Sequence, residues 1–364
     1  MEVGSIAESG WRRWLRSPSI LAVILALVHP AATALARVDW RVDMLTHFVG
    51  PGLALSLVAA GLVVVTWRGH RRWWAVGLLA LATWQGSVAF RYDGANPVPA
   101  AGAGRGRLRL LVLNVQKDNR RTDAIAALIR DERPDVVGLV EVSPHHVAGL
   151  DALGIGLEYP FRMVHPLGGQ GLMLLFRDPP LGLFPPTILA PEGNPVARAT
   201  VRVGDLAVSL WLAHPPNPIG TGRARADGDL VALGEAIGRS EGPRILVGDL
   251  NRSEGSPHFA DLLRASGLRD GRLGFGREPS WPAWSPYRIA IDHTLVSPEL
   301  AVAWRRVGPD VGSDHLPVLI EVGPAEPGGE GGPTSSANRS AHQPRSSGGG
   351  AGSPENLDRS TAPR

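Results

Sequence analysis

Cysteine is absent from the 364 residues of this chain. Its absence excludes disulfide bonds, thiolate-bound zinc, iron–sulfur clusters and cysteine nucleophiles. Net charge is also small, because 37 lysine and arginine residues are balanced by 34 aspartate and glutamate residues, which leaves a formal charge of +3. A surplus of that size does not indicate binding to a polynucleotide. Any metal in the protein must therefore bind through oxygen or imidazole ligands.

Charged residues are missing from three apolar runs near the N-terminus. The runs extend from Pro18 to Ala36, from Met44 to Trp67 and from Trp73 to Phe90. Each approaches the ~20 residues that a helix needs to cross a bilayer. We therefore predict three transmembrane helices, at about 18–36, 44–67 and 73–90. Tryptophans lie at or just beyond the ends of the runs, where amphipathic rings favour the lipid headgroup layer: Trp11, Trp14, Trp40, Trp67, Trp73 and Trp74.

The distribution of arginine predicts the orientation of these helices. Positively charged flanks stay on the cytoplasmic side of a membrane, and arginines cluster before the first run and in the second connector, at Arg12, Arg13, Arg16, Arg68, Arg71 and Arg72. In the first connector, by contrast, two arginines are balanced by two aspartates. The pattern predicts a multi-pass protein of the cell membrane, in contact with the lipid bilayer, whose residues after Phe90 are extracytoplasmic. Alternatively, the first run is a signal peptide cleaved after Ala34-Leu35-Ala36, which leaves the same topology.

The C-terminal segment has too few apolar residues to form a core. The 42 residues from Gly323 to Arg364 contain 9 Gly, 7 Ser and 6 Pro, and Leu357 is their only large aliphatic residue. Such a composition predicts a disordered tail over 323–364. Residues 92–107, rich in Gly, Ala and Pro, are predicted to link the membrane region (1–91) to a soluble domain of residues 108–322.

Residues 108–322 alternate between apolar runs typical of strands and segments with helical spacing. Predicted helices cover 123–133, behind Thr122 as N-cap, 230–237 and 259–264. Mixed helices and strands, with a hairpin at Gly204-Asp205, predict an α/β (α+β) domain with partly antiparallel sheets. The predicted strands cover 108–115, 136–142, 171–177, 244–250, 288–297 and 316–322.

Acids, amides and histidines lie at the ends of these strands. Ligands at one edge of a sheet can meet in space although they are far apart in the sequence. Each residue alone has a local explanation, such as a turn, a helix cap or a side chain that bonds its own backbone. Their combination has no such explanation. The residues are Asn114, Glu141, His214, Asp249, Asn251, Asp292, Asp314 and His315.

This combination, in this order, resembles the endonuclease/exonuclease/phosphatase family of metal-dependent phosphodiesterases and phosphomonoesterases. That family includes pancreatic-type DNases, exonuclease-type AP endonucleases, inositol-phosphate 5-phosphatases and neutral sphingomyelinases. The resemblance implies a four-layer sandwich, in which two mixed β-sheets are flanked by helices, here preceded by the three transmembrane helices. Its most specific motifs are Gly248-Asp249-Leu250-Asn251, Ile291-Asp292-His293 and Ser313-Asp314-His315-Leu316-Pro317, and Ser280-Trp281-Pro282 is similar to a Thr-Trp-Pro segment of many bacterial members.

The resemblance also implies roles for the site residues. Glu141, Asp314 and Asn114 would hold a divalent cation, and oxygen ligands without cysteine suit Mg²⁺ or Mn²⁺. His315 would be the catalytic histidine and Asp292 the carboxylate that orients it. Asp249 with Asn251 would position or activate the attacking water, and His214 would contact the phosphate. Whether His315 or Asp249 is the general base stays open on the sequence.

Two features depart from the family pattern. No carboxylate at a clear spacing is available to orient His214, and the stretch from Glu141 to His214 is short, which leaves little room for the loops with which nucleases grip DNA. The adjacent His145 and His146 are predicted to be surface residues, because neighbouring side chains of an extended segment diverge.

The sequence thus predicts a membrane-anchored, metal-dependent phosphoesterase that acts outside the cytoplasm. Its substrate would be a phosphate ester of a nucleic acid, a phospholipid headgroup or a sugar phosphate, and no obligate protein partner is inferred. The alternative is a catalytically inactive binding or sensory module of the same fold. Transport through the apolar runs is disfavoured, because they contain no carboxylate that could mark an ion path.

Overall fold

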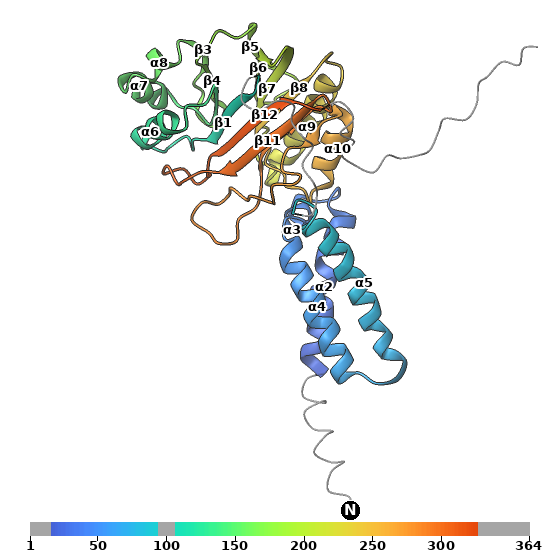
Figure 1. Cartoon of the computed structure of the whole chain (residues 1–364). Helices are drawn as coiled ribbons and strands as arrows, with labels where there is room; N and C mark the ends of the chain where they lie inside the picture. Colours follow the sequence, from blue (N-terminus) through green and yellow to red (C-terminus); the bar gives the residue numbers. More distant parts are fainter. Residues whose placement is uncertain (1–15, 94–105, 327–364) are drawn as a thin grey trace, which may run out of the picture. The chain divides into compact units, whose positions relative to one another are not determined.

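The computed structural model describes residues 16–93 and 106–326 (Figure 1). These residues fall within one compact unit, in which a helical region precedes two β-sheets with helices against them. Most of the predicted tail (323–364) and of the predicted linker (92–107) lies outside the described residues.

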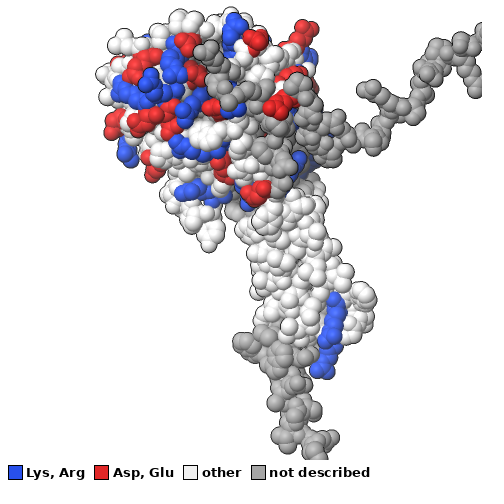
Figure 2. Space-filling view, viewed as in Figure 1, with Lys and Arg blue, Asp and Glu red and all other residues white. Residues whose placement is uncertain are grey.

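The N-terminal helices pack together through small side chains. The fully buried Ala26, Ala59 and Val63 form their shared core, whereas larger aliphatic side chains such as Leu21 and Val58 point outward and are more than half exposed. In Figure 2 the middle of this region is uncharged; its charges lie at the two ends, with Arg68, Arg71 and Arg72 at one and Arg37, Asp39, Arg41 and Asp43 at the other. Its elements are α2 (Arg16–Leu35), α3 (Trp40–Leu45), α4 (Val49–Thr66), η1 (Gly69–Arg72) and α5 (Trp73–Ala89).

The prediction of three transmembrane helices is corrected to two helices of sufficient length among the described residues. Pro18–Leu35 and Val49–Thr66 are long and apolar enough to cross a membrane, a property that signal sequences and buried core helices can share. The third predicted helix, α5, has 17 residues. At 1.5 Å per residue it measures about 25 Å, less than the ~30 Å of a bilayer core.

The remaining described residues form two six-stranded mixed sheets. In the first sheet β1 and β2 are parallel and all other neighbours are antiparallel; its order is β11 (Leu300–Val307), β12 (Val318–Pro324), β1 (Leu108–Asn114), β2 (Val136–Val140), β4 (Leu172–Phe176) and β3 (Phe161–His165). In the second sheet β7 and β8 are the parallel pair; its order is β5 (Gly182–Ile188), β6 (Pro195–Val203), β7 (Leu206–Ala213), β8 (Arg244–Asp249), β10 (Asp292–Val296) and β9 (Arg269–Asp270).

Three apolar cores stack these elements in four layers. The central core joins the inner faces of the sheets and includes Leu110 and Val112 of β1 and Ile245 and Val247 of β8. One outer core lies between the first sheet and α6 (Thr122–Glu132) and α7 (Pro144–Ala152), and the other between the second sheet and α9 (Arg223–Gly238) and α10 (Pro257–Ser266). The short elements α8 (Ile155–Glu158), η2 (Gly168–Gln170) and η3 (Gly220–Gly222) lie in connections. The predicted sandwich of two mixed sheets flanked by helices is confirmed.

Several predicted details are wrong. Thr122 is the first residue of α6, whose N-cap is Arg121. Helix α7 and strands β3, β5 and β11 were not predicted. His146, predicted to be a surface residue, is fully buried, because residues 144–152 form a helix in which the His146 ring accepts a hydrogen bond from the Ser143 N–H. Tyr92, at the start of the predicted linker, is also buried, where its hydroxyl donates to Asp270 at 3.0 Å.

Candidate active site

The strand register brings the predicted site residues to one end of the two sheets. Asn114 ends β1, and Glu141 directly follows β2, the parallel neighbour of β1. In the second sheet Asp249 ends β8. Asp292 begins β10 rather than ending a strand as predicted, but antiparallel pairing still sets it directly opposite Asp249.

His315 reaches the same place from the connection between β11 and β12. Since β12 runs antiparallel to β1, its beginning lies beside the end of β1. The Ser313 hydroxyl fixes this connection: it donates to the Asn114 carbonyl at 2.6 Å and accepts from the His315 N–H at 3.1 Å. Residues 199 positions apart are thereby held together.

The amide of Asn114 lies at the centre of the site. Its Nδ2 donates to Glu141 Oε1 and to Asp249 Oδ2, both at 3.0 Å, and lies 3.4 Å from His315 Nε2. The side chain is buried, and its Oδ1 accepts from the Gln116 N–H, which fixes the direction of the amide. Asn114 therefore links the two carboxylates that belong to different sheets.

His315 and Asp292 form the expected imidazole–carboxylate pair. His315 Nδ1 lies 2.8 Å from Asp292 Oδ2, which also accepts from the Ser280 hydroxyl at 2.5 Å. Nε2 of the ring is directed toward Asp249 Oδ2, 3.6 Å away. Burial alone would lower the pKa of His315, but the charges of Asp292 and Asp249 outweigh burial and raise it to about 10.

His214, which follows β7, is oriented by a backbone carbonyl instead of a carboxylate. Its Nδ1 lies 3.1 Å from the Gly169 carbonyl oxygen, so Nδ1 donates and Nε2 faces the site. Nε2 is 3.5 Å from Asp249 Oδ2 and 3.3 Å from Asn251 Nδ2. Burial opposes the charged imidazole, but the hydrogen bond and charge of Asp249 raise the pKa of His214. Burial likewise opposes ionisation of Asp249, yet the two imidazoles hold its pKa far below its usual range.

Asp314 lies at the edge of the site. Its Oδ2 accepts from the Trp281 indole N–H at 3.2 Å. Trp281 and Ser280, which donates to Asp292, both belong to the Ser-Trp-Pro motif. That motif therefore supports two of the predicted site residues from one segment.

Six of the eight predicted site residues line a cleft of about 420 Å³, and the buried Asn114 and Asp292 support them from behind: the six are Glu141, His214, Asp249, Asn251, Asp314 and His315. Glu141, Asp249 and Asp314 contribute carboxylates to its wall, while Lys117 and Arg225 contribute the cations. The cleft also includes Met44 and His47, which precede α4 in the apolar N-terminal region. Neither residue was predicted as part of the site, because no local pattern links residues 44–47 to the strand ends.

The donor set fits a hard divalent cation. Glu141 presents both carboxylate oxygens at the site, held by the Asn114 side chain and the Lys117 N–H. A second grouping, Asp249, Asp292 and His315, has ligand atoms within 4.8 Å of one another and could also hold a metal. The Asp292 side chain is 1% exposed and its Oδ2 bonds the His315 ring, whereas the Glu141 side chain is 22% exposed and lines the cleft, so we favour Glu141 as the principal ligand.

Comparison with known proteins agrees with this arrangement. The sequence model of the Endonuclease/Exonuclease/phosphatase family matches residues 111–315. Among curated proteins none matches the chain. Two similar solved structures are a D. rerio TDP2 humanized by 14 mutations (16% identity, 60% of this chain, 99% of the other, TM-score 0.50) and an endonuclease/exonuclease/phosphatase from Bacteroides vulgatus (18% identity, 60% and 99%, TM-score 0.50).

At these identities the solved structures establish the fold alone. The sequence match is stronger, because it covers more than half of the chain and both of its boundaries fall on elements of the site, β1 and the Asp314-His315 motif. The chain belongs to the endonuclease/exonuclease/phosphatase family.

Proposed function

We propose that the protein is a membrane-anchored, divalent-metal-dependent phosphoesterase whose catalytic domain acts outside the cytoplasm. The observation that carries this proposal is the convergence of Glu141, Asp249, Asn251 and His315 in one cleft, with the buried Asn114 bonded to Glu141 and Asp249 behind them. A binding or sensory module would not need this complete set of acid, amide and imidazole groups, so the inactive alternative is disfavoured.

Within this proposal the residues divide the reaction between them. Asp249 orients the attacking water, since its Oδ1 is fixed by the Asn251 N–H at 2.9 Å and the residue lines the cleft. His315, oriented by Asp292, and His214, oriented by Gly169, direct Nε2 atoms toward the phosphoryl oxygens. Glu141 and Asp314 would hold Mg²⁺ or Mn²⁺, and Asn114, whose Nδ2 donates to Glu141, would orient that ligand rather than bind the ion as the sequence predicted. The ion would neutralise charge on the phosphoryl and leaving oxygens.

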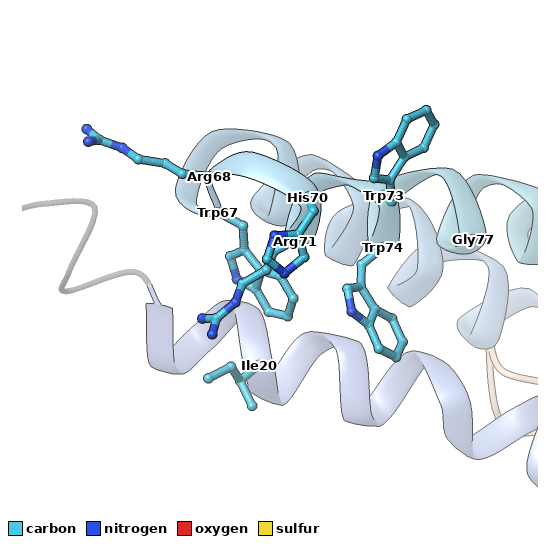
Figure 3. A pocket seen from close by; sticks show the side chains of 8 residues that line it. All are labelled: Ile20, Trp67, Arg68, His70, Arg71, Trp73, Trp74 and Gly77. Atoms are coloured by element: carbon cyan, nitrogen blue, oxygen red, sulfur yellow. The ribbon is translucent and has the colours of Figure 1, made fainter.

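Side chains at the far end of the helical region support the membrane anchor. Figure 3 shows Trp67, Arg71 and Trp74 gathered on the side of Ile20, with Arg68 and Trp73 pointing outward. Tryptophan and arginine together are typical of the headgroup layer on the cytoplasmic side. In addition, α2 packs against α4 through Ala26 and Ala59, which favours a retained helix over a cleaved signal peptide.

The test is hydrolysis by the full-length chain in detergent. Bis(p-nitrophenyl) phosphate serves as a generic phosphodiester, followed by DNA, phospholipid and inositol-phosphate panels, each with Mg²⁺, with Mn²⁺ and with EDTA. We expect metal-dependent turnover that falls about 10²–10⁴-fold in His315→Ala and Glu141→Ala. His165→Ala, at the end of β3, and Glu235→Ala, on an exposed part of α9, are the matched controls. A folded wild type without turnover on any panel refutes the proposal.

A further inference from the structure

The segment between α2 and α4 packs against the loop that carries Asp249 and Asn251. Asp43 Oδ2 lies 3.2 Å from Arg252 Nε, and His47 Nδ1 is hydrogen bonded to the Ser253 hydroxyl. A Cβ atom placed on Gly255 would lie only 2.1 Å from the Thr46 carbonyl oxygen, so the two backbones are in direct contact there. Three consecutive contacts thus join residues 43–47 to residues 252–255.

Arg252 connects this contact to the site. Its side chain is 1% exposed, and Nη2 pairs with Asp227 of α9 at 2.6 Å. Nη1 donates to the Asn251 carbonyl at 3.1 Å, while the Arg252 carbonyl accepts from His293 Nε2 at 2.7 Å. The guanidinium therefore holds the Asn251 carbonyl, His293 holds the carbonyl of the next residue, and Asp43 supplies a carboxylate partner of the guanidinium.

Asn251 depends on such support because of its backbone conformation. Its φ of +52° lies in the left-handed region, which residues other than glycine adopt in a small minority of cases, asparagine more readily than most. Its side chain nevertheless points into the site, where Nδ2 donates to the Pro215 carbonyl at 3.0 Å and lies beside His214. A loop held in an uncommon conformation needs surrounding contacts that fix it, and Arg252 provides them.

The same segment supplies part of the cleft wall. Met44 and His47 line the cleft together with Asn251, His214 and Ile219. Both residues lie in the connection between α2, which ends at Leu35, and α4, which begins at Val49. An apolar thioether and an imidazole therefore border the space in which the substrate must lie.

We propose that residues 43–47, from the membrane region, are part of the active site. Asp43 is a positioning residue that acts through Arg252 on Asn251 and Asp249, and Met44 and His47 are specificity residues that contact the substrate beyond the reacting phosphate. This inference rests on the proposed phosphoesterase function. It implies that the apolar helices do more than tether the domain, because residues 108–322 alone would lack one side of the cleft.

Steady-state kinetics of the full-length chain on bis(p-nitrophenyl) phosphate test the positioning role. In Asp43→Asn we expect kcat to fall about ten- to a hundredfold with little change in KM, since a small displacement of a water-orienting group costs rate. Asp43→Glu, which keeps the charge, is expected to recover part of the loss. Met44→Ala should raise KM more than it lowers kcat. An unchanged kcat in folded Asp43→Asn overturns the inference.

The matched control is Asp261→Asn. Asp261 of α10 pairs with Arg37, which follows the end of α2, so this pair also joins the helical region to the domain. Unlike the Asp43–Arg252 pair, it is exposed, and Asp261 lies outside the 249–255 loop. If Asp43 only helped to hold the helical region against the domain, Asp43→Asn and Asp261→Asn would have similar, small effects on kcat and KM. Equal kinetic parameters in the two variants therefore contradict the positioning role.

A measurement independent of activity covers the case in which Asp43→Asn fails to fold. Because the chain has no cysteine, His47→Cys/Ser253→Cys can form only one intramolecular disulfide. With a protease site inserted between residues 94 and 105, the oxidised double variant should migrate as one species after cleavage and separate into two on reduction. Two fragments without reduction would refute the contact and the inference. If the wild type lacks turnover, the phosphoesterase function fails, whatever the disulfide shows, and the inference falls with it.

Discussion

Asp292 Oδ2 is shared by the His315 ring and the Ser280 hydroxyl, so the direction of the imidazole depends on a single oxygen atom. In Asp292→Asn the substituted amide can present its nitrogen to His315 Nδ1, which reverses the donor and favours the wrong tautomer. We expect kcat to fall by about two to four orders of magnitude while the fold is retained.

Ser280→Ala should cost less than Asp292→Asn, about tenfold, because the carboxylate remains. Ser266→Ala is the control, since this buried hydroxyl bonds the Leu262 carbonyl of its own helix. Kinetics on a generic phosphodiester, with circular dichroism to verify folding, give the comparison. A Ser280→Ala effect as large as that of Asp292→Asn would contradict the proposed order of importance.

His146 gives a prediction about stability and pH. Burial, followed by the neighbouring His145, lowers the pKa of His146 from 6.5 to about 4. Between these values the unfolded chain binds a proton that the folded protein excludes, so this contribution to stability is complete above pH 6.5 and is lost as the pH falls toward 4. The loss amounts to roughly 2–4 kcal/mol.

His146→Asn keeps an acceptor for the Ser143 N–H but does not titrate. Urea unfolding at pH 7.5 and 4.5 should show a smaller pH dependence in this variant than in the wild type. His165→Asn, at a partly exposed position, should leave the wild-type dependence unchanged. Parallel pH dependences of wild type and His146→Asn would show that His146 is not the group responsible.

At the level of single residues, the polar set could be identified in the sequence because its members lie beside apolar strands. Gly169 could not be predicted, since it acts through its carbonyl and any residue supplies a carbonyl. Ser280 and Trp281 were noticed as a motif, but their partners Asp292 and Asp314 depend on tertiary contacts. The prediction of a surface position for His146 is wrong, because residues 144–152 form a helix and not an extended segment.

At the level of elements, the end of β8 is where strand packing and the site meet. Gly248 has a φ of +134°, and a Cβ atom there would lie 2.0 Å from the Ala213 carbonyl oxygen of β7. We expect Gly248→Ala to destabilise the domain by more than ~2 kcal/mol and to reduce turnover, because the backbone before Asp249 must move.

The control for Gly248→Ala is Gly228→Ala in α9. A Cβ atom there meets nothing within 4 Å, so the substitution should be neutral or stabilise the helix by up to ~1 kcal/mol. Denaturant unfolding of both variants gives the comparison. Equal stabilities would mean that β7 can shift to admit the methyl group and that the contact is not constraining.

Strands could be predicted where the sequence shows a single clear pattern, such as a run of apolar residues. Buried strands such as β1, β2, β4 and β8 have continuous apolar sequences and were found. Strand β5 was missed because it is an edge strand with Pro185 and Pro186, a composition that edges tolerate and central strands do not. The contact between Asp43 and Arg252 was out of reach, because no local pattern relates residues 209 positions apart.

At the level of the whole molecule, the arginines give a prediction about topology. Arg68, Arg71 and Arg72 lie between α4 and α5, next to tryptophans that favour the headgroup layer. If this end faces the cytoplasm, the cleft, the 43–47 segment and the two sheets lie outside it. This arrangement would require the short α5 to cross as well, which local thinning of the bilayer or flanking side chains that reach the interface would allow.

Reporter fusions test this arrangement. Alkaline phosphatase, active only outside the cytoplasm, should be active when fused after residue 326 and inactive when inserted at 69–71; a fluorescent protein that folds only in the cytoplasm should show the reverse. Replacing Arg68, Arg71 and Arg72 by glutamine should weaken the contrast, because positive charge retains the connector inside. Cytoplasmic signal from the fusion after residue 326 would overturn the orientation. It would also confine the substrate to cytoplasmic phosphate esters, while the geometry of the cleft would stand.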